Sequence, residues 1–156
     1  MNLDPATTAL IVIDLQRGIV GRQAAPHSAS EVVERCAKLA DAFRERNALV
    51  VLVHVAFADE RERLKPDADS PAPSGPLPPD WSDFVPEIGP RDGDIIITKR
   101  QWGAFYGTAL ELQLRRRGIR TLVYGGIATN FGVESTARDA YERGFEQVHV
   151  RVRALR

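Results

Sequence analysis

The sequence predicts a three-layer α/β/α sandwich with a mainly parallel, doubly wound sheet. Three observations support this class: short apolar runs recur, stretches with helical apolar spacing lie between them, and glycines follow those stretches. Apolar runs of this kind are typical of strands buried on both faces of a parallel sheet, and their alternation with helices indicates βαβ units. With 156 residues, 44% of them hydrophobic, the chain is expected to form a single domain over residues 1–156.

The first βαβ unit is expected in the N-terminal third of the chain. Residues 9–13 form an apolar run, and residues 48–57 form a second, β-branched run. Between them, Ser28 is followed three residues later by Glu31, the pattern of a capping box, and apolar residues then recur at helical spacing. The single cysteine, Cys36, lies on this apolar stripe, so we expect a buried structural thiol and no internal disulfide.

The second half of the chain repeats the pattern. Residues 95–97 and 121–124 are apolar runs that predict two further strands. Between them, Thr108 and Glu111 have the spacing of a capping box, and Gly118 has the place of the residue that follows a helix C-terminus. A helix is therefore expected between these two strands.

One more helix and one more strand are expected in the C-terminal part. Four residues share a helical face: Val133, Ala137, Ala140 and Tyr141. Residues 147–153 alternate valine with histidine or arginine, which predicts a strand with one face in water. The sheet is thus expected to gain a fifth strand at the end of the chain.

A Pro-rich loop is expected over residues 59–91, which hold eight of the ten prolines and show no convincing periodicity. Connections this long are commonly lids, binding loops or disordered segments. We expect a lid or a subunit-contact loop that carries Trp81 and Phe84. The alternative is a flexible surface excursion.

The charge balance points to small-molecule chemistry. Acidic and basic residues number 21 each, which argues against a nucleic-acid partner and favours a small-molecule substrate. The N-terminus lacks a basic, apolar leader, and no apolar run approaches the roughly 20 residues that span a bilayer. A cytoplasmic protein without membrane association is expected.

Two charged residues and a glycine lie at the ends of predicted strands. Asp14 follows the first strand, Lys99 closes the third, and Gly132 lies in the turn after the fourth. Ligands of open parallel α/β sheets bind beyond these carboxyl ends. Asp14 alone could be a turn or N-cap residue, and Lys99 alone a solvated strand end. Because lysine is rare in this chain and the three positions converge, we expect a site.

Three blocks of sequence resemble, in order, those of the isochorismatase-like hydrolase family of the cysteine hydrolase superfamily. They are IVIDLQ at residues 11–16, ITKRQWGAFYGTALELQLRRRGI at 97–119 and GIATNFGVESTARDA at 126–140. The resemblance implies an isochorismatase-like, Rossmann-like domain, with a C-terminus shorter than the family norm. It also implies a catalytic triad in which Asp14 and Lys99 correspond to the aspartate and lysine. Gly132 stands where the family usually has its nucleophilic cysteine.

The resemblance extends to the surroundings of the triad. A cis peptide of the family corresponds to the Ile127–Ala128 bond, and it would direct the Ala128 amide into the pocket. Together with the Gly132 amide at a helix N-terminus, this arrangement could bind an anionic group. Four further residues are expected to line the substrate pocket: Gln16, Trp102, Phe105 and Asn130. Packing is an equal alternative for Trp102 and Phe105.

No metal site and no cofactor are expected. Nicotinamidases of the resembled family bind a metal through an Asp-x-His pattern, whereas this chain has His-Val-Ala-Phe at residues 54–57. The three histidines, His27, His54 and His149, have no ligand spacing and are expected to be ordinary polar or surface residues. No G-x-G-x-x-G loop follows the first strand, which disfavours a flavodoxin-like cofactor binder.

Glycine at the cysteine position leaves three hypotheses open. The first is a hydrolase of a small carboxylated substrate, because isochorismatases resembling this fold also have glycine there and cleave a vinyl ether. Asp14 would be the general acid, and Lys99 would bind the substrate carboxylate or stabilise the changing charge. The second is a catalytically silent member that binds a small anionic ligand, and the third is a former cysteine-dependent amidase. The resemblance also implies a homo-oligomer, a dimer or larger.

Overall fold

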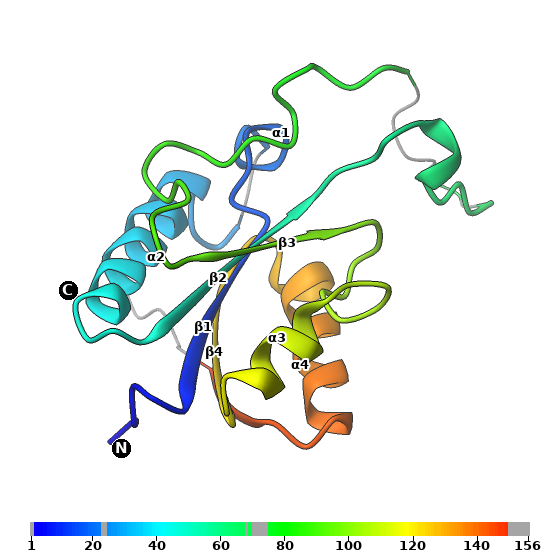
Figure 1. Ribbon diagram of the computed structural model, residues 1–156. Coiled ribbons are helices and arrows are strands. Elements are labelled where there is room, and N and C mark those ends of the chain that lie inside the picture. The colour runs from blue at the N-terminus through cyan, green and yellow to red at the C-terminus, as the bar shows by residue number, and fades with distance from the viewer. Residues whose placement is uncertain (1, 23–24, 68, 70–74, 150–156) are drawn as a thin grey trace.

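The computed structural model describes residues 2–22, 25–67, 69 and 75–149, and it confirms the expected α/β class (Figure 1). Its sheet has five strands, all parallel, in the order β3-β2-β1-β4-β5. The strands are β1 (Thr8–Ile13), β2 (Leu49–Val55), β3 (Ile95–Lys99), β4 (Thr121–Gly126) and β5 (Glu146–His149). The predicted fifth strand therefore begins one residue earlier, and its part beyond residue 149 lies outside the described residues.

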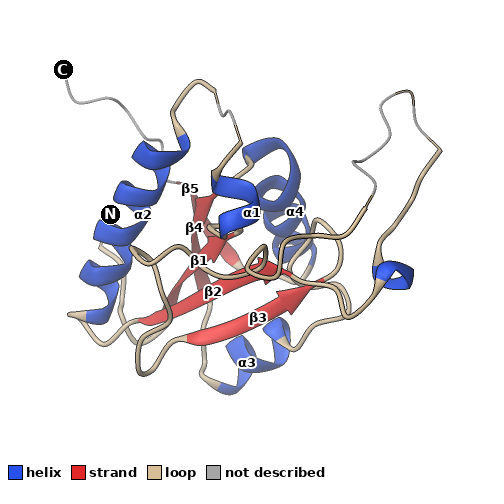
Figure 2. Ribbon diagram, turned by 90° about the horizontal axis from the view of Figure 1, so that it is seen from above, coloured by secondary structure: helices blue, strands red, loops and turns tan. Residues whose placement is uncertain are grey.

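Helices cover both faces of this sheet (Figures 1 and 2). The long helix α2 (Ala29–Arg44) packs on one face, and α3 (Leu110–Arg116) and α4 (Glu134–Glu142) pack on the other. The strand β1 supplies alternate residues to the two cores: Ile11 and Ile13 face α3 and α4, whereas Leu10 and Val12 face α2. A short helix α1 (Arg17–Val20) follows β1.

Two of the predicted helix starts have different outcomes. The capping box of Ser28 and Glu31 is present at the start of α2. The one predicted from Thr108 and Glu111 is wrong, because α3 begins at Leu110 without a side-chain cap. The Thr108 hydroxyl instead accepts a hydrogen bond from the Leu110 amide and donates to the Ala104 carbonyl. A threonine two residues before a helix thus stabilises the preceding turn.

The expected face of the last helix is only partly buried. Ala137 and Ala140 of α4 are buried, but Tyr141 is 73% exposed. The helix also starts later than its apolar spacing suggests, because a π-helical turn, Thr129–Val133, precedes it. The buried residues of α4 are Thr136, Ala137 and Ala140, so its buried face is centred near Ala140 and Tyr141 lies at the edge of that face.

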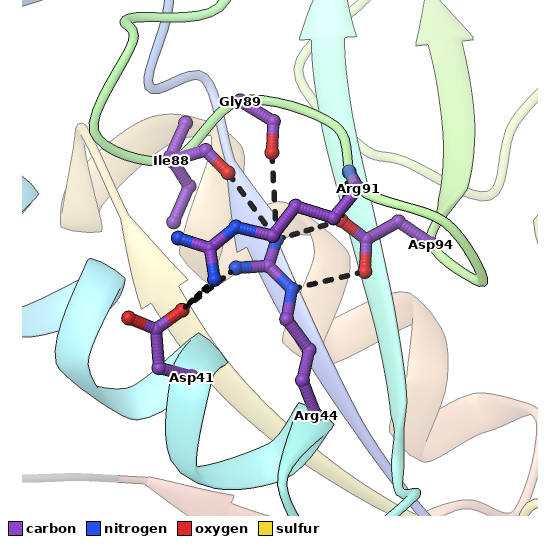
Figure 3. Close-up of polar contacts among 6 residues, drawn as sticks. All are labelled: Asp41, Arg44, Ile88, Gly89, Arg91 and Asp94. Atoms are coloured by element: carbon purple, nitrogen blue, oxygen red, sulfur yellow. Dashed lines mark hydrogen bonds and ion pairs between the residues drawn. The ribbon is translucent and has the colours of Figure 1, made fainter.

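The long connection between β2 and β3 contains a short 3₁₀ helix, Glu60–Glu62, and part of it extends away from the sheet (Figure 2). Its last part is anchored to α2 by the buried side chain of Arg44 (Figure 3). Arg44 pairs with Asp94 at 2.6 Å, donates to the carbonyls of Ile88 and Gly89, and also pairs with Asp41. This cluster fixes the segment that leads into β3.

Among the residues that the structure describes, no helix has the length and apolarity needed to cross a membrane.

Candidate functional site

The charged pair Asp14 and Lys99 lies at the carboxyl end of the sheet. Asp14 directly follows β1 with a positive φ of 58°, and Lys99 is the last residue of β3. The strand β2 lies between them, and its Val53 carbonyl accepts a hydrogen bond from the Asp14 amide at 2.9 Å. Lys99 Nζ lies 2.8 Å from Asp14 Oδ2, and both side chains are buried. The structure thus brings these two predicted site residues into direct contact.

All three hydrogens of the Lys99 ammonium have acceptors within the protein. Besides Asp14, the Gln101 carbonyl lies 3.2 Å from Nζ and the Trp102 carbonyl 2.9 Å. An ammonium has three donors and no acceptor. Lys99 therefore holds its position and supplies charge, but it has no spare hydrogen for a substrate carboxylate.

One oxygen of the Asp14 carboxyl is still able to accept a hydrogen bond. Asp14 Oδ1 is buried and has no hydrogen-bond partner among the described residues, whereas Oδ2 accepts from Lys99. Burial raises the pKa of the Asp14 carboxyl from 3.8 to about 6, and the nearby charges of Lys99 and His54 oppose this rise only in part. A buried carboxyl with such a pKa can take up and release a proton near neutral pH.

Gly132 touches the same pair. A Cβ atom built on Gly132 would lie 3.0 Å from Asp14 Oδ2 and 3.3 Å from Lys99 Nζ. Glycine has no group that can attack a substrate, so the residue beside the charged pair offers no nucleophile. Gly132 lies inside the π-helical turn rather than in the first turn of a regular helix, which differs from the expected helix N-terminus.

The peptide bond between Ile127 and Ala128 is cis. Ile127 is buried in the core on the α2 side, and its amide donates to the Ile13 carbonyl at 3.0 Å. The cis bond connects β4 to the turn that contains Gly132. This segment therefore places Gly132 next to the end of β1.

Two aromatic side chains lie on the two segments that contact the pair of Asp14 and Lys99. Trp102 is 64% exposed and Phe131 is 45% exposed, and their ring centroids are 5.1 Å apart. Trp102 provides one of the carbonyls that accept from Lys99, and Phe131 precedes Gly132 in the chain. Asn130, the neighbouring predicted pocket residue, is exposed. These three side chains are available to a ligand.

Gln16 and Phe105 differ from the expected lining of the pocket. The fully buried Gln16 amide donates to the carbonyls of Val55 and Trp81 and accepts from the Val55 amide. Both of its donors are used, so Gln16 joins β2 to the long loop. Phe105 is buried in the core against Phe145. Both residues have structural contacts in place of contacts with a ligand.

His54 is a residue whose importance the sequence did not reveal. It lies near the end of β2, stacks on Phe84 and contributes a charge that acts on Asp14. Its Nδ1 donates to the Ser82 carbonyl at 2.7 Å, and its Nε2 lies 2.9 Å from Thr98 Oγ1. The signal in the sequence was only its place near the carboxyl end of a predicted strand.

The described residues contain no group of three or more histidine, cysteine, aspartate or glutamate side chains that could hold a metal. Cys36 is buried 2.8 Å from the position that a Cβ on Gly125 would occupy, and burial raises the pKa of its thiol to about 11. A thiol of this kind is a poor nucleophile at neutral pH. Cys36 thus has the properties of a core residue.

Comparison with known proteins agrees with this geometry. The profile of the Isochorismatase domain matches residues 8–154. The isochorismatase family protein YwoC of Bacillus subtilis (strain 168) is 53% identical over 152 residues, which are 96% of this chain and 78% of YwoC. The solved structure of an isochorismatase family protein from Burkholderia thailandensis superposes with a TM-score of 0.89 and 49% identity, over 96% of this chain and 78% of that one.

A more distant structure has a defined activity in its name. N-carbamoylsarcosine amidase from Thermoplasma acidophilum is 32% identical, with a TM-score of 0.75 over 92% of this chain and 81% of that chain. Fold, sequence profile and strand-end residues lead to one assignment. The chain belongs to the isochorismatase family.

Proposed function

We propose that this protein is a hydrolase that cleaves a small carboxylated vinyl ether, with Asp14 as the general acid. The observation that carries the proposal is the Asp14 carboxyl, which is buried, has a pKa of about 6 and keeps one oxygen without a hydrogen-bond partner in the part of the chain that the structure describes. Vinyl-ether hydrolysis needs an acid more than a nucleophile, so the absence of a thiol at residue 132 is compatible with it.

The proposed reaction begins with proton transfer from Asp14 to the methylene carbon of the vinyl ether. A new C–H bond forms, the double bond is consumed, and an oxocarbenium ion results. Water then adds to this ion and gives one proton back to the Asp14 carboxylate. The resulting hemiketal breaks its C–O bond to the alcohol, and the products are a 2-keto acid and the alcohol.

Lys99 has an electrostatic role in this scheme. Its three hydrogens are held by Asp14 and two backbone carbonyls, so we assign to it the stabilisation of the Asp14 carboxylate after proton transfer rather than direct binding of the substrate carboxylate. An ion pair favours the charged form of a carboxyl, and burial favours the neutral form. The balance of the two sets the proton affinity of Asp14.

The test is pyruvate release from isochorismate by the purified protein, with Asp14→Ala beside it. Release that depends on Asp14 supports the proposal. A folded wild-type protein that releases no pyruvate rules out isochorismate as the substrate. Equal release by Asp14→Ala would remove the general-acid role.

A second candidate function rests on the surroundings of Gly132. A side chain at this position would begin 3.0 Å from Asp14 and 3.3 Å from Lys99, the contact that an activated thiol needs. The similarity to N-carbamoylsarcosine amidase supports the idea that the scaffold once hydrolysed amides. Gly132→Cys is then expected to react with iodoacetamide faster than Cys36 does and to hydrolyse a carbamoyl amide. A Gly132→Cys variant that folds but gains neither property contradicts this candidate.

A further inference from the structure

A buried hydroxyl connects the two segments that touch the charged pair. Thr136 lies in α4 and is fully buried. Its Oγ1 donates to the Gly132 carbonyl at 2.6 Å and accepts from the Ala104 amide at 3.1 Å. A single hydroxyl thus serves as donor to one segment and acceptor from the other.

Both segments contribute to the surroundings of Lys99. Gly132, in the turn Thr129–Val133, packs against the pair from one side. The loop that contains Ala104 also supplies the carbonyls of Gln101 and Trp102, which accept from the Lys99 ammonium. The relative position of these segments therefore decides how tightly Lys99 is held against Asp14.

Ala104 is held through both of its backbone polar groups. Its amide donates to Thr136, and its carbonyl accepts from the Thr108 hydroxyl at 2.5 Å. Ala104 itself is fully buried. A buried polar group that is left without a hydrogen bond destabilises the folded state. This loop therefore depends on the Thr136 hydroxyl as the acceptor for the Ala104 amide.

We propose that Thr136 is a positioning residue of the site, which holds the Gly132 turn and the Gln101–Trp102 carbonyls in register around Lys99. Only the consequence for catalysis rests on the proposed function. The geometric effect of Thr136 exists whether or not the protein cleaves a vinyl ether. Among the described residues, the Thr136 hydroxyl hydrogen-bonds to Gly132 and Ala104 rather than to Asp14 or Lys99, so its influence passes through the two segments.

Replacement of Thr136 by valine keeps the volume and removes the hydroxyl. The Gly132 carbonyl and the Ala104 amide both lose a buried partner, and the two segments are free to separate. Lys99 is then held less firmly against Asp14. Serine keeps the hydroxyl and is expected to preserve both hydrogen bonds.

The consequence is measurable at Asp14 in the free protein. The charges that face Asp14 are Lys99 from β3 and His54 from β2, and burial acts in the opposite direction. A weaker contact with Lys99 removes part of the attraction that favours the carboxylate. The pKa of Asp14 should therefore rise, and the affinity of Asp14 for a proton should increase about tenfold.

The experiment is an NMR titration of the Asp14 carboxyl carbon in wild type, Thr136→Val, Thr136→Ser and Thr121→Val. Thr121 is a matched control, because its buried hydroxyl donates to Glu146 at 3.0 Å at the opposite end of β4. The proposal expects a raised pKa in Thr136→Val, and wild-type values in Thr136→Ser and Thr121→Val. A folded Thr136→Val with the wild-type value overturns it, as does an equal rise in Thr121→Val.

A second measurement needs no substitution at all. In the wild-type protein, the Ala104 amide should exchange with solvent as slowly as the amides of the central strands, because its partner is a fully buried hydroxyl. Exchange at the rate of an open loop would overturn the proposal, even where Thr136→Val does not fold. Neither readout uses turnover, so a protein inactive toward isochorismate leaves this test intact.

Discussion

Two buried ion pairs lie at opposite ends of β3, and they differ in how fully their polar groups are used. At the amino end, both oxygens of Asp94 accept from Arg44, at 3.2 and 2.6 Å, and the Arg91 amide adds a third hydrogen bond at 2.9 Å. At the carboxyl end, Lys99 donates to one oxygen of Asp14, and the other oxygen accepts no hydrogen bond from any described residue. The side chains of both pairs are largely or wholly buried.

This difference separates a pair that holds structure from one that can react. A carboxylate whose two oxygens both accept charge-assisted hydrogen bonds binds its neighbours in a fixed geometry. A buried carboxylate with an unused oxygen stays costly to ionise, which leaves it able to exchange a proton with a substrate. Two aspartates, each paired with a cation, therefore have different roles because their hydrogen-bond partners differ.

The largest expected effect is on turnover, and it should affect only one of the pairs. Asp14→Asn keeps the shape of the side chain and removes the acidic proton, so turnover of a vinyl-ether substrate should fall by about 10²–10⁴-fold. Asp94→Asn lies at the other end of β3 and should leave the turnover of the folded protein close to wild type. Steady-state kinetics of both variants give the comparison. Equal losses in the two variants would contradict the division of roles.

The next effect is on stability, and it should fall on the other pair. Arg44→Met leaves the Asp94 carboxylate buried without its cation and also removes a donor to the Ile88 and Gly89 carbonyls. Loss of one partner of a buried pair costs about 3–5 kcal/mol of the free energy of unfolding. Urea denaturation measures this cost. Arg91→Met is the matched control, since its exposed pair with Asp41 is expected to contribute less than about 1 kcal/mol.

A third prediction uses the dependence of stability on pH. Because the pKa of Asp14 is about 6 in the folded protein and ordinarily 3.8, the folded state binds more protons than the unfolded state between these values. The stability of wild type relative to Asp14→Asn should therefore fall as the pH rises from about 4 to about 6, and then stay level. The full difference is about 3 kcal/mol. Urea denaturation of both proteins across this range checks it, and parallel curves would contradict the raised pKa.

Much of the fold could be predicted because the signals were local. The four apolar runs, the alternating segment that begins at residue 147, and the capping box of Ser28 and Glu31 all correspond to elements of the structure. The start of α3 was missed because Thr108 hydrogen-bonds within the turn before the helix. The exposure of Tyr141 was missed because helical spacing identifies one side of α4 but not the width of its buried face, and Tyr141 lies at the edge of that face.

The centre of the site could also be predicted, but its surroundings could not. Asp14 and Lys99 follow strands that end at one edge, so parallel topology alone brings them together. Gln16 and Phe105 also lie near strand ends, yet their side chains point into backbone contacts and the core. His54 acts on Asp14 from the neighbouring strand, and a strand order of β3-β2-β1 cannot be read from local patterns.

The smallest expected effect tests whether burial, rather than contact distance, separates these two ion pairs from ion pairs at the protein surface. Lys38 and Glu34 on α2 lie 2.6 Å apart, the same distance as Arg44 and Asp94, but their side chains are 74% and 65% exposed. Water already solvates both charges, so Lys38→Met should lower the free energy of unfolding far less than Arg44→Met does. Urea denaturation of Lys38→Met and Arg44→Met, at low and high salt, measures the contrast. If Lys38→Met lowered the free energy of unfolding as much as Arg44→Met does, contact distance would set the strength of both pairs. The distinction between the two ends of β3 would then have to rest on Asp14 alone.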